Sequence, residues 1–409
     1  MKASIHQRRR GRSLVVGALV FVFVSVAAQA QDAVAPSARC KIYGWVEGGV
    51  TANPDEPATR QNFGHLFSDR SNELLLNQTV ITAERTLGGG DNFDWGFKAQ
   101  FLYGSDARFI HSVGLLDNTQ HELWQPDLVE AWVLLRFPIT NTAGGLDVKG
   151  GKFVTLEGAE TIDPRPNVFY SHSYIFNFGL PLNHTGILFI LHALKWFDFY
   201  AGATRGVNTS VTDNNSSLGF LGGFGLNFFE GKLTALATTH VGPESYHDNH
   251  DERYLNDLVI TWKATSKLTA ILEGNFAMDE SVPGNAKAYG GAIYLTCALN
   301  HWLSLGIREE IFCDETGFFV GSFADNDDFI DLQRGETTHI DPRTFFAAGT
   351  FNEVTIGASI KIPLAKPLAS LTIRPELRYD AALSSGTTPF GNQDVRDQFT
   401  ASIDAIVSF

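Results

Sequence analysis

The feature that most constrains the fold is a strict alternation of apolar and polar residues, which recurs in windows of about ten residues. In the clearest window, Phe93–Tyr103, every second residue is apolar or aromatic, while Asp94, Lys98 and Gln100 occupy positions between them. A helix, with its period of 3.6 residues, would scatter the apolar residues around its circumference. The window therefore predicts a β-strand with one polar face and one highly aromatic face.

The same alternation recurs along the chain and predicts about sixteen strands, with 14–18 as the range. An even number is typical of closed bacterial barrels. Pro375 cannot donate a ladder hydrogen bond, so we expect a bulge or bend there. The predicted windows are 42–51, 73–86, 93–103, 126–137, 146–156, 185–194, 195–206, 217–229, 231–241, 253–263, 266–277, 285–299, 301–313, 346–362, 371–380 and 398–409.

The connections between these windows alternate between short and long. Short joints fall at 88–92, 141–145, 230, 265, 300 and 365–367, and the long segments are 52–72, 105–125, 157–184, 207–216, 242–252, 278–284, 314–345 and 382–395. Tight periplasmic turns and long outer loops are typical of an outer-membrane barrel. We therefore expect an all-β, antiparallel, up-and-down transmembrane β-barrel with both termini in the periplasm. A soluble sandwich, the alternative, would bury its apolar faces and would need fewer residues.

The N-terminal segment 1–30 has the composition of a cleavable signal peptide, so the barrel is expected over residues 31–409. A basic stretch precedes an apolar run that is too short for a membrane anchor, and Ala28-Gln29-Ala30 is a small-x-small cleavage site. The chain carries 31 Lys+Arg and 45 Asp+Glu, and removing the five basic residues of the signal leaves 26 − 45 = −19. This balance excludes nucleic acid as a partner, because phosphate binding needs clustered positive charge.

Charged residues on the polar faces of the windows are expected to point into the lumen, since Lys or Arg facing lipid at the midplane costs about 2–4 kcal/mol. About sixteen strands enclose a water-filled channel, and such charges would set its ion selectivity. The alternative is that they pair across strands and brace a narrow barrel. The expected pore-lining residues are Lys98, Glu130, Arg136, Glu273, Arg308, Glu310, Arg374, Glu376, Arg378 and Asp404.

The segment 157–184 is long and rich in aromatic and polar residues. Such a segment could fold inward and narrow the channel, or it could pack on the rim as a surface loop. The residues expected to form the constriction, if it folds inward, are Glu157, Glu160, Asp163, Arg165, Tyr170 and His172.

Metal and catalytic sites find little support in the sequence. The acidic stretch 325–331 could hold Ca²⁺, but it lacks the glycine and the final glutamate of a calcium loop. No G-x-S-x-G or H-E-x-x-H motif is present, so we expect neither an enzyme nor a cofactor or metal. The alternatives are a barrel-borne lipid hydrolase or deacylase, for which His192 is the histidine to examine, and a non-conducting barrel for adhesion or structure.

The final residue, Phe409, is expected to be the last lipid-facing position of the terminal strand, which must pair with the strand beginning near Ile42 to close the barrel. We expect this strand to be the signal that the barrel-assembly machinery reads.

Several short stretches also resemble a known family. They are 151–160, Asn167, 170–173 and 180–186, together with 44–49, 77–78 and 308–317. These resemble the family named "putative β-barrel porin, OmpL-like". The resemblance implies a porin-type barrel in the outer membrane of Gram-negative bacteria, in contact with lipid and small solutes or ions, and it assigns no substrate or catalytic residue. Many sixteen-stranded porins are trimers, so a homotrimer is a further expectation.

Overall fold

The computed structural model describes residues 39–88, 92–119, 122–321 and 348–409. The expected signal peptide, 1–30, and the acidic stretch 325–331 lie outside the described residues.

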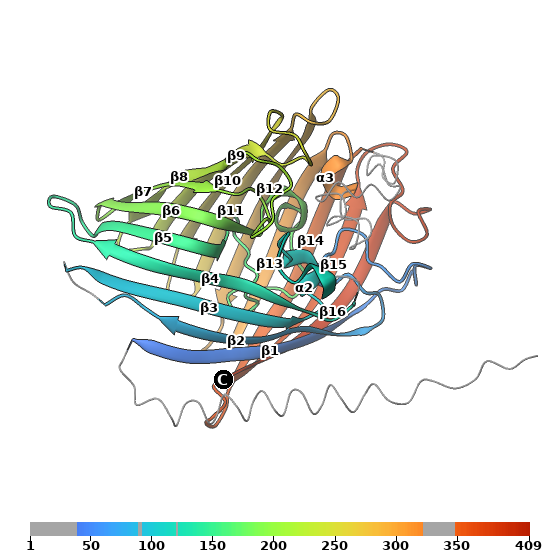
Figure 1. Ribbon diagram of the computed structural model, residues 1–409. Helices are drawn as coiled ribbons and strands as arrows, with labels where there is room; N and C mark the ends of the chain where they lie inside the picture. The colour runs from blue at the N-terminus through green and yellow to red at the C-terminus, as the bar shows by residue number, and fades with distance from the viewer. Residues whose placement is uncertain (1–38, 89–91, 120–121, 322–347) are drawn as a thin grey trace, which may run out of the picture.

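Sixteen antiparallel strands close into one barrel in which each strand pairs with its neighbours in the chain and β1 pairs with β16 (Figure 1). The strands are β1 (Cys40–Ala52), β2 (Leu74–Arg85), β3 (Asp94–Gly104), β4 (Gln125–Phe137), β5 (Gly145–Val154), β6 (Asn183–Leu194), β7 (Phe197–Thr204), β8 (Gly219–Phe228), β9 (Leu233–Pro243), β10 (Glu252–Lys263), β11 (Leu268–Asp279), β12 (Ala286–Ala298), β13 (Leu303–Asp314), β14 (Gly349–Pro363), β15 (Ser370–Ala382) and β16 (Asp397–Ser408).

The predicted fold class and strand number are confirmed, since each of the sixteen windows overlaps one strand. The alternation explains why: a strand that separates two environments needs apolar side chains on one face and polar side chains on the other. In β16, for example, Phe399 and Ile403 are exposed on the outer surface, whereas Thr400 and Asp404 are buried on the inner side. The weakest window, 146–156, is the strand β5.

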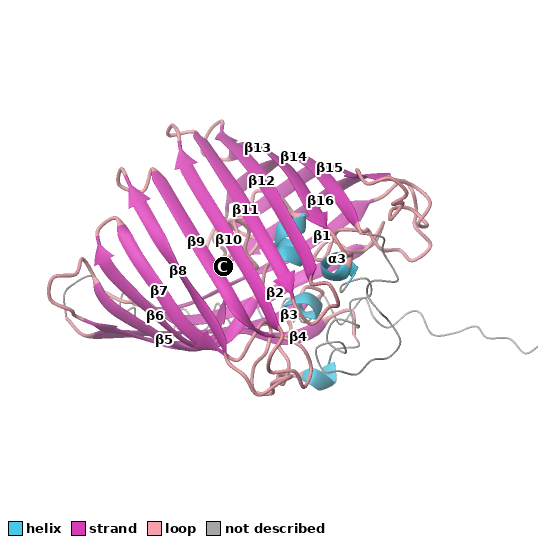
Figure 2. Cartoon of the chain, turned by 90° about the horizontal axis from the view of Figure 1, so that it is seen from above, coloured by secondary structure: helices cyan, strands magenta, loops and turns pink. Residues whose placement is uncertain are grey.

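Short helical elements occur only in the long connections of the described chain. They are α2 (Ala107–Ile110), η1 (Asp117–Thr119), η2 (Ile175–Gly179) and α3 (Phe318–Gly321). Figure 2, a view turned by 90°, shows the helices gathered at the end of the barrel where the long connections lie. The tight turns lie at the opposite end, where β1 begins and β16 ends.

An apolar core fills part of the barrel lumen. Inner-face residues such as Trp45, Phe312 and Ile406 pack with Phe67 and Tyr174 from the long connections. Ile406 interrupts the polar face of β16, and its burial in this cluster (1% exposed) explains that exception. The long connections therefore share one hydrophobic core with the inner wall of the barrel.

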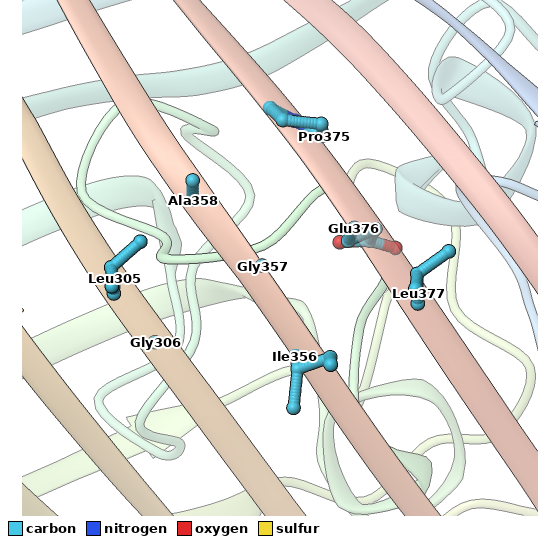
Figure 3. A pocket seen from close by; sticks show the side chains of 8 residues that line it. All are labelled: Leu305, Gly306, Ile356, Gly357, Ala358, Pro375, Glu376 and Leu377. Carbon is cyan, nitrogen blue, oxygen red and sulfur yellow. The ribbon is translucent and has the colours of Figure 1, made fainter.

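Pro375 causes no bulge, so the expectation of a bulge at this position was wrong. The β14–β15 register is the same on both sides, with Gly357 opposite Glu376 and Ile360 opposite Ile373. Only the ladder is interrupted between these pairs, because proline has no N–H to donate. A hollow of about 440 Å³ lies here on the barrel wall, and Figure 3 shows Ala358 and Pro375 among the residues around it.

Candidate functional site

The connection between β5 and β6, residues 155–182, lies inside the barrel and is called the inner loop below. Its backbone N–H groups donate to carboxylates on strands across the lumen. Gly158 N donates to Asp257 Oδ2 on β10 (2.9 Å) and Ile175 N donates to Glu310 Oε1 on β13 (2.7 Å). Tyr170 N donates to Glu376 Oε2 on β15 (2.8 Å). The loop is thus fastened to three strands far from its own ends.

Three arginines of the barrel wall donate hydrogen bonds to backbone carbonyls of the same loop. Arg308 Nη1 donates to the carbonyl of Ser171 at 2.9 Å, and Arg378 Nη1 donates to that of His172 at 2.6 Å. Arg374 Nη1 donates to three loop carbonyls, including Phe169 O at 2.8 Å. The three arginines are at most 2% exposed. Charge-assisted hydrogen bonds of this kind are about twice as strong as neutral ones, so the loop is held in one position.

The ten expected pore-lining residues fall into two environments. Lys98, Glu130 and Arg136 lie on β3 and β4, away from the inner loop, with Lys98 Nζ 2.5 Å from Glu130 Oε1 and Arg136 Nη2 2.6 Å from Asp147 Oδ2. The other seven lie beneath the loop or bind a residue that does, and they are Glu273, Arg308, Glu310, Arg374, Glu376, Arg378 and Asp404. Asp404, for instance, accepts from Arg374 at 2.6 Å.

Three of the expected constriction residues make ion pairs. Glu160 Oε1 accepts from Arg308 Nη1 at 2.6 Å, which joins the loop to β13. Asp163 and Arg165 pair with each other at 2.5 Å, and the Arg165 guanidinium lies 4.0 Å from the centre of the Trp45 ring on β1. Arg165 is exposed, so this part of the loop faces open space.

The other three are buried. Tyr170 donates its hydroxyl to Asn77 Oδ1 at 3.0 Å, and the His172 ring stacks on Phe176. Burial and the charge of Arg308 hold the pKa of His172 well below its usual value, so its imidazole is neutral. Burial, assisted by the charge of Asp257, raises the pKa of Glu157 well above its usual value. Neither Glu157 oxygen has a hydrogen-bond partner among the described residues.

The sequence reasoning missed an apolar part of the lumen. Phe153, Leu188 and Leu221 form a fully buried cluster, against which Trp132 and Tyr200 pack. A signal was present: β4 and β6 contain apolar runs in which both faces of the strand are apolar. A strand whose lumen face met only water would not need that pattern.

Among the described residues one Ser–His–Asp series occurs, and its geometry does not favour hydrolysis. His65 Nδ1 lies 3.0 Å from Ser68 Oγ, and its Nε2 lies 3.4 Å from Asp380 Oδ2. All three side chains are at most 4% exposed, and Asp380 also accepts from Arg378. Burial and Arg378 lower the pKa of His65, which keeps the ring neutral. The series braces a connection against the wall rather than presenting a nucleophile to a substrate.

His192, the other histidine considered for catalysis, binds carboxylates. Its Nδ1 lies 2.8 Å from Asp198 Oδ1 and its Nε2 lies 3.3 Å from Asp147 Oδ2. Within the described ranges no group of three or more His, Cys, Asp or Glu residues is arranged to hold a metal ion. None of the helices in that part of the chain is long and apolar enough to cross a membrane.

Solved structures with the same fold include a protein described as an outer-membrane channel and one described as a porin. The chain is similar to Pseudomonas putida OprB (13% identity, TM-score 0.56, 91% of this chain and 94% of that chain covered). It is also similar to an anion-selective porin from Comamonas acidovorans (10%, 0.56, 90% and 99%) and to the outer-membrane channel DcaP of Acinetobacter baumannii (11%, 0.52, 91% and 99%). At these identities the likeness shows the fold alone. A comparison with curated protein sequences finds no match.

A family model decides the relationship. The model described as "Putative beta-barrel porin-2, OmpL-like" matches residues 39–409, which is the whole barrel. This confirms the resemblance seen in short stretches of the sequence, and it identifies a porin-type barrel of the outer membrane. The chain belongs to the OmpL-like family of β-barrel porins.

Proposed function

We propose that this protein is a passive channel through which small hydrophilic solutes or ions diffuse across the outer membrane. One observation carries the proposal: the inner loop covers only one side of the lumen. Arg308, Glu310 and Asp404 are buried on that side, whereas Trp132 and Lys149 on the facing inner wall stay partly exposed. A side chain that points into a barrel and remains exposed borders open space, so the passage follows the wall of β4–β9.

The inner loop is proposed to form the constriction, with the expected residues Glu157, Glu160, Asp163, Arg165, Tyr170 and His172 on it. Of these, Arg165 is the exposed cation, paired with Asp163, and lies where the loop borders open space. On the facing wall, the pairs of Lys98 with Glu130 and of Arg136 with Asp147 are proposed to line the passage. Rows of paired opposite charges across a narrow passage create a transverse field that tunes selectivity.

Single-channel recording of refolded protein in a planar bilayer tests the proposal. Folding is checked first by the heat-dependent shift in electrophoretic mobility. We expect stepwise ohmic currents and a reversal potential in a salt gradient that reports the selectivity. A folded barrel that gives no conductance steps would refute the channel and leave a structural or adhesive barrel. Hydrolysis of phospholipid by the same preparation would favour the enzyme instead.

The proposal also covers how the protein is exported and how it assembles in the outer membrane. Residues 1–30 would direct export and be cleaved, and the turns beside both chain ends would face the periplasm. The strand ending in Phe409 would be read by the barrel-assembly machinery. A homotrimer is supported by a structural neighbour, Vibrio cholerae OmpT (12% identity, TM-score 0.51), which was solved in a trimer form. Chemical cross-linking of protein extracted in mild detergent tests the oligomer.

A further inference from the structure

An apolar strip runs along the exposed inner wall, formed by Trp132, Leu134, Ile190 and Tyr200. Strand register places these residues on the lumen face. Trp132 lies opposite Lys98, and Ile190 lies opposite both Asp147 and Tyr200. Because paired residues of adjacent strands point to the same side of a sheet, the strip shares its face with these lumen charges.

The strip has a firm base. Phe153, Leu188 and Leu221 are fully buried and support Trp132, Ile190 and Tyr200. The strip residues themselves remain partly exposed. A partly exposed apolar surface in a water-filled passage leaves unfavourable hydration in place, which an apolar solute would relieve by about 25 cal/mol per Å² covered. The base keeps the surface from collapsing on itself, so the strip is preorganised to receive an apolar group.

A lysine without an ion partner lies within this strip. Lys149 is opposite Leu134 on β4 and Leu188 on β6. Its Nζ lies 4.9 Å from the centre of the Trp132 ring and 5.7 Å from that of Phe153, and no carboxylate of the described residues forms a salt bridge with it. An ammonium held over aromatic faces is attracted to them without using its N–H donors.

The carboxylates near Lys149 are already engaged. Glu130 accepts from Lys98 at 2.5 Å and from Trp132 Nε1 at 2.7 Å. Asp147 accepts from two nitrogens of Arg136 at 2.6 Å each. These pairings leave Lys149 as the cation of this wall that is open to a solute anion, with an apolar surface directly beside it.

We infer that the apolar strip and Lys149 together form a binding subsite for organic anions that carry a carboxylate and an apolar, in particular aromatic, body. The carboxylate pairs with Lys149 while the ring lies on Trp132 and Ile190. This inference rests on the proposed channel, whose substrate class it names. A neutral sugar would leave Lys149 without a counter-ion, and an aromatic amine would place two like charges together.

The test measures block of single-channel current by phenylacetate, with acetate, benzyl alcohol and benzylamine as matched probes. We expect phenylacetate to reduce the current at concentrations where the other three have little effect. Lys149→Met should weaken that block by up to about fivefold, the upper end of the range for a partly exposed ion pair. Ile190→Thr should weaken it too, without affecting acetate. Lys361→Met is the control, since Lys361 is an exposed lysine on the lumen face of β14, opposite Thr372.

The same probes are titrated by calorimetry into the folded barrel in detergent, which reports binding without conductance. Absence of conductance together with Lys149-dependent phenylacetate binding would reject the channel and keep the subsite. Conductance with equal block by phenylacetate and acetate, or by phenylacetate and benzylamine, would overturn the subsite and keep the channel. Binding that is unaffected by Lys149→Met but lost in Lys361→Met would place the site elsewhere and overturn the inference.

Discussion

The guanidinium of Arg308 on β13 and the carboxylate of Glu160 on the inner loop lie 2.6 Å apart, in a setting where both side chains are nearly inaccessible to water. The same guanidinium is 2.8 Å from Glu353 on β14. Arg308 therefore connects two wall strands and the loop through one planar group, a role that suits arginine because its donors form a rigid fork. The loop position depends on this contact more directly than the barrel does.

Replacing Glu160 with glutamine should loosen the inner loop while leaving the barrel folded. Arg308 keeps Glu353 as its counter-ion, so no uncompensated charge is buried, and the loss is about 1–3 kcal/mol at the loop. We expect larger and noisier single-channel currents. The control is Glu309→Gln, which removes a neighbouring carboxylate that lies exposed on the outer face and accepts from Asn352. Equal currents in the Glu160→Gln variant and the unmodified protein would show that the loop does not limit flow.

Docking of the β7–β8 connection, which contains Val207, against the buried Glu244 should weaken as pH rises. Glu244 is 4% exposed and accepts from Val207 N at 2.9 Å, and burial raises its pKa to about 8 against the opposing charge of Arg253. The charges of Asp213 and Asp279 favour the protonated form further, and His240 Nδ1 lies 3.9 Å away.

The direction of this pH effect follows from the difference in proton binding between the docked and undocked states. The folded state keeps its proton up to pH about 8, whereas an undocked Glu244 loses it near pH 4.3. The free energy that holds the Val207 connection against Glu244 is therefore greatest below pH about 4.3. It falls as pH rises from about 4.3 to about 8 and is constant above that. The protection factor of the Val207 amide in hydrogen exchange should follow this course. It should become independent of pH in Glu244→Gln, and a protection factor that rises with pH would contradict the assignment.

Much of the fold could be predicted from the sequence because a membrane barrel imposes two environments on every strand. The alternation at Phe93–Tyr103 and in β16 follows from that demand alone. Strands with an interrupted pattern were predicted less well. Pro375 suggested a bulge, but a missing N–H can be tolerated by omitting two pairs from the ladder without changing register.

The site was less predictable, because which wall residues meet the inner loop depends on contacts between distant parts of the chain. Arg374 and Asp404 alternate with apolar neighbours in the same way as Lys98 does, yet the first two are buried under the loop and Lys98 is not. The apolar strip left a trace in β4 and β6, where Trp132 and Ile190 occupy positions that the alternation reserves for polar residues. The reason for these apolar residues is visible only in the closed barrel, where buried residues such as Leu188 pack against Trp132 and Ile190.

Cysteine labelling should separate the two faces of β3. With Cys40, Cys297 and Cys313 replaced by serine, Lys98→Cys should react with a charged maleimide in the assembled protein, because position 98 is partly exposed on the inner face and is proposed to border the water-filled passage. Phe101→Cys, three residues along the same strand and exposed on the outer surface, should react in detergent but poorly in lipid vesicles. Equal labelling of the two positions in vesicles would contradict the assignment of the lumen face.

Deleting Phe409 should impair assembly more than it changes the conductance of assembled molecules. Phe409 N donates to Gly44 O at 3.0 Å and Gly44 N donates to Phe409 O at 3.1 Å, so the last residue completes the seam between β1 and β16. Its ring also lies against Gly44, where an added Cβ would come within 2.7 Å of it. Loss of two seam hydrogen bonds and of a lipid-facing ring leaves backbone groups unpaired at the membrane boundary, where each costs several kcal/mol.

The measurement is the fraction of heat-modifiable barrel recovered from membranes, compared between the Phe409 deletion, Phe409→Tyr and the unmodified chain. Phe409→Tyr keeps the ring and both backbone hydrogen bonds, so its yield should stay near that of the unmodified chain while the deletion falls severalfold. The few molecules of the deletion variant that fold should give the same single-channel currents as the unmodified protein. Both backbone hydrogen bonds of Phe409 are to Gly44 on β1, so the deletion leaves the inner loop in place. Normal yield of the deletion would mean that the seam tolerates an open end and that Phe409 is not needed for closure.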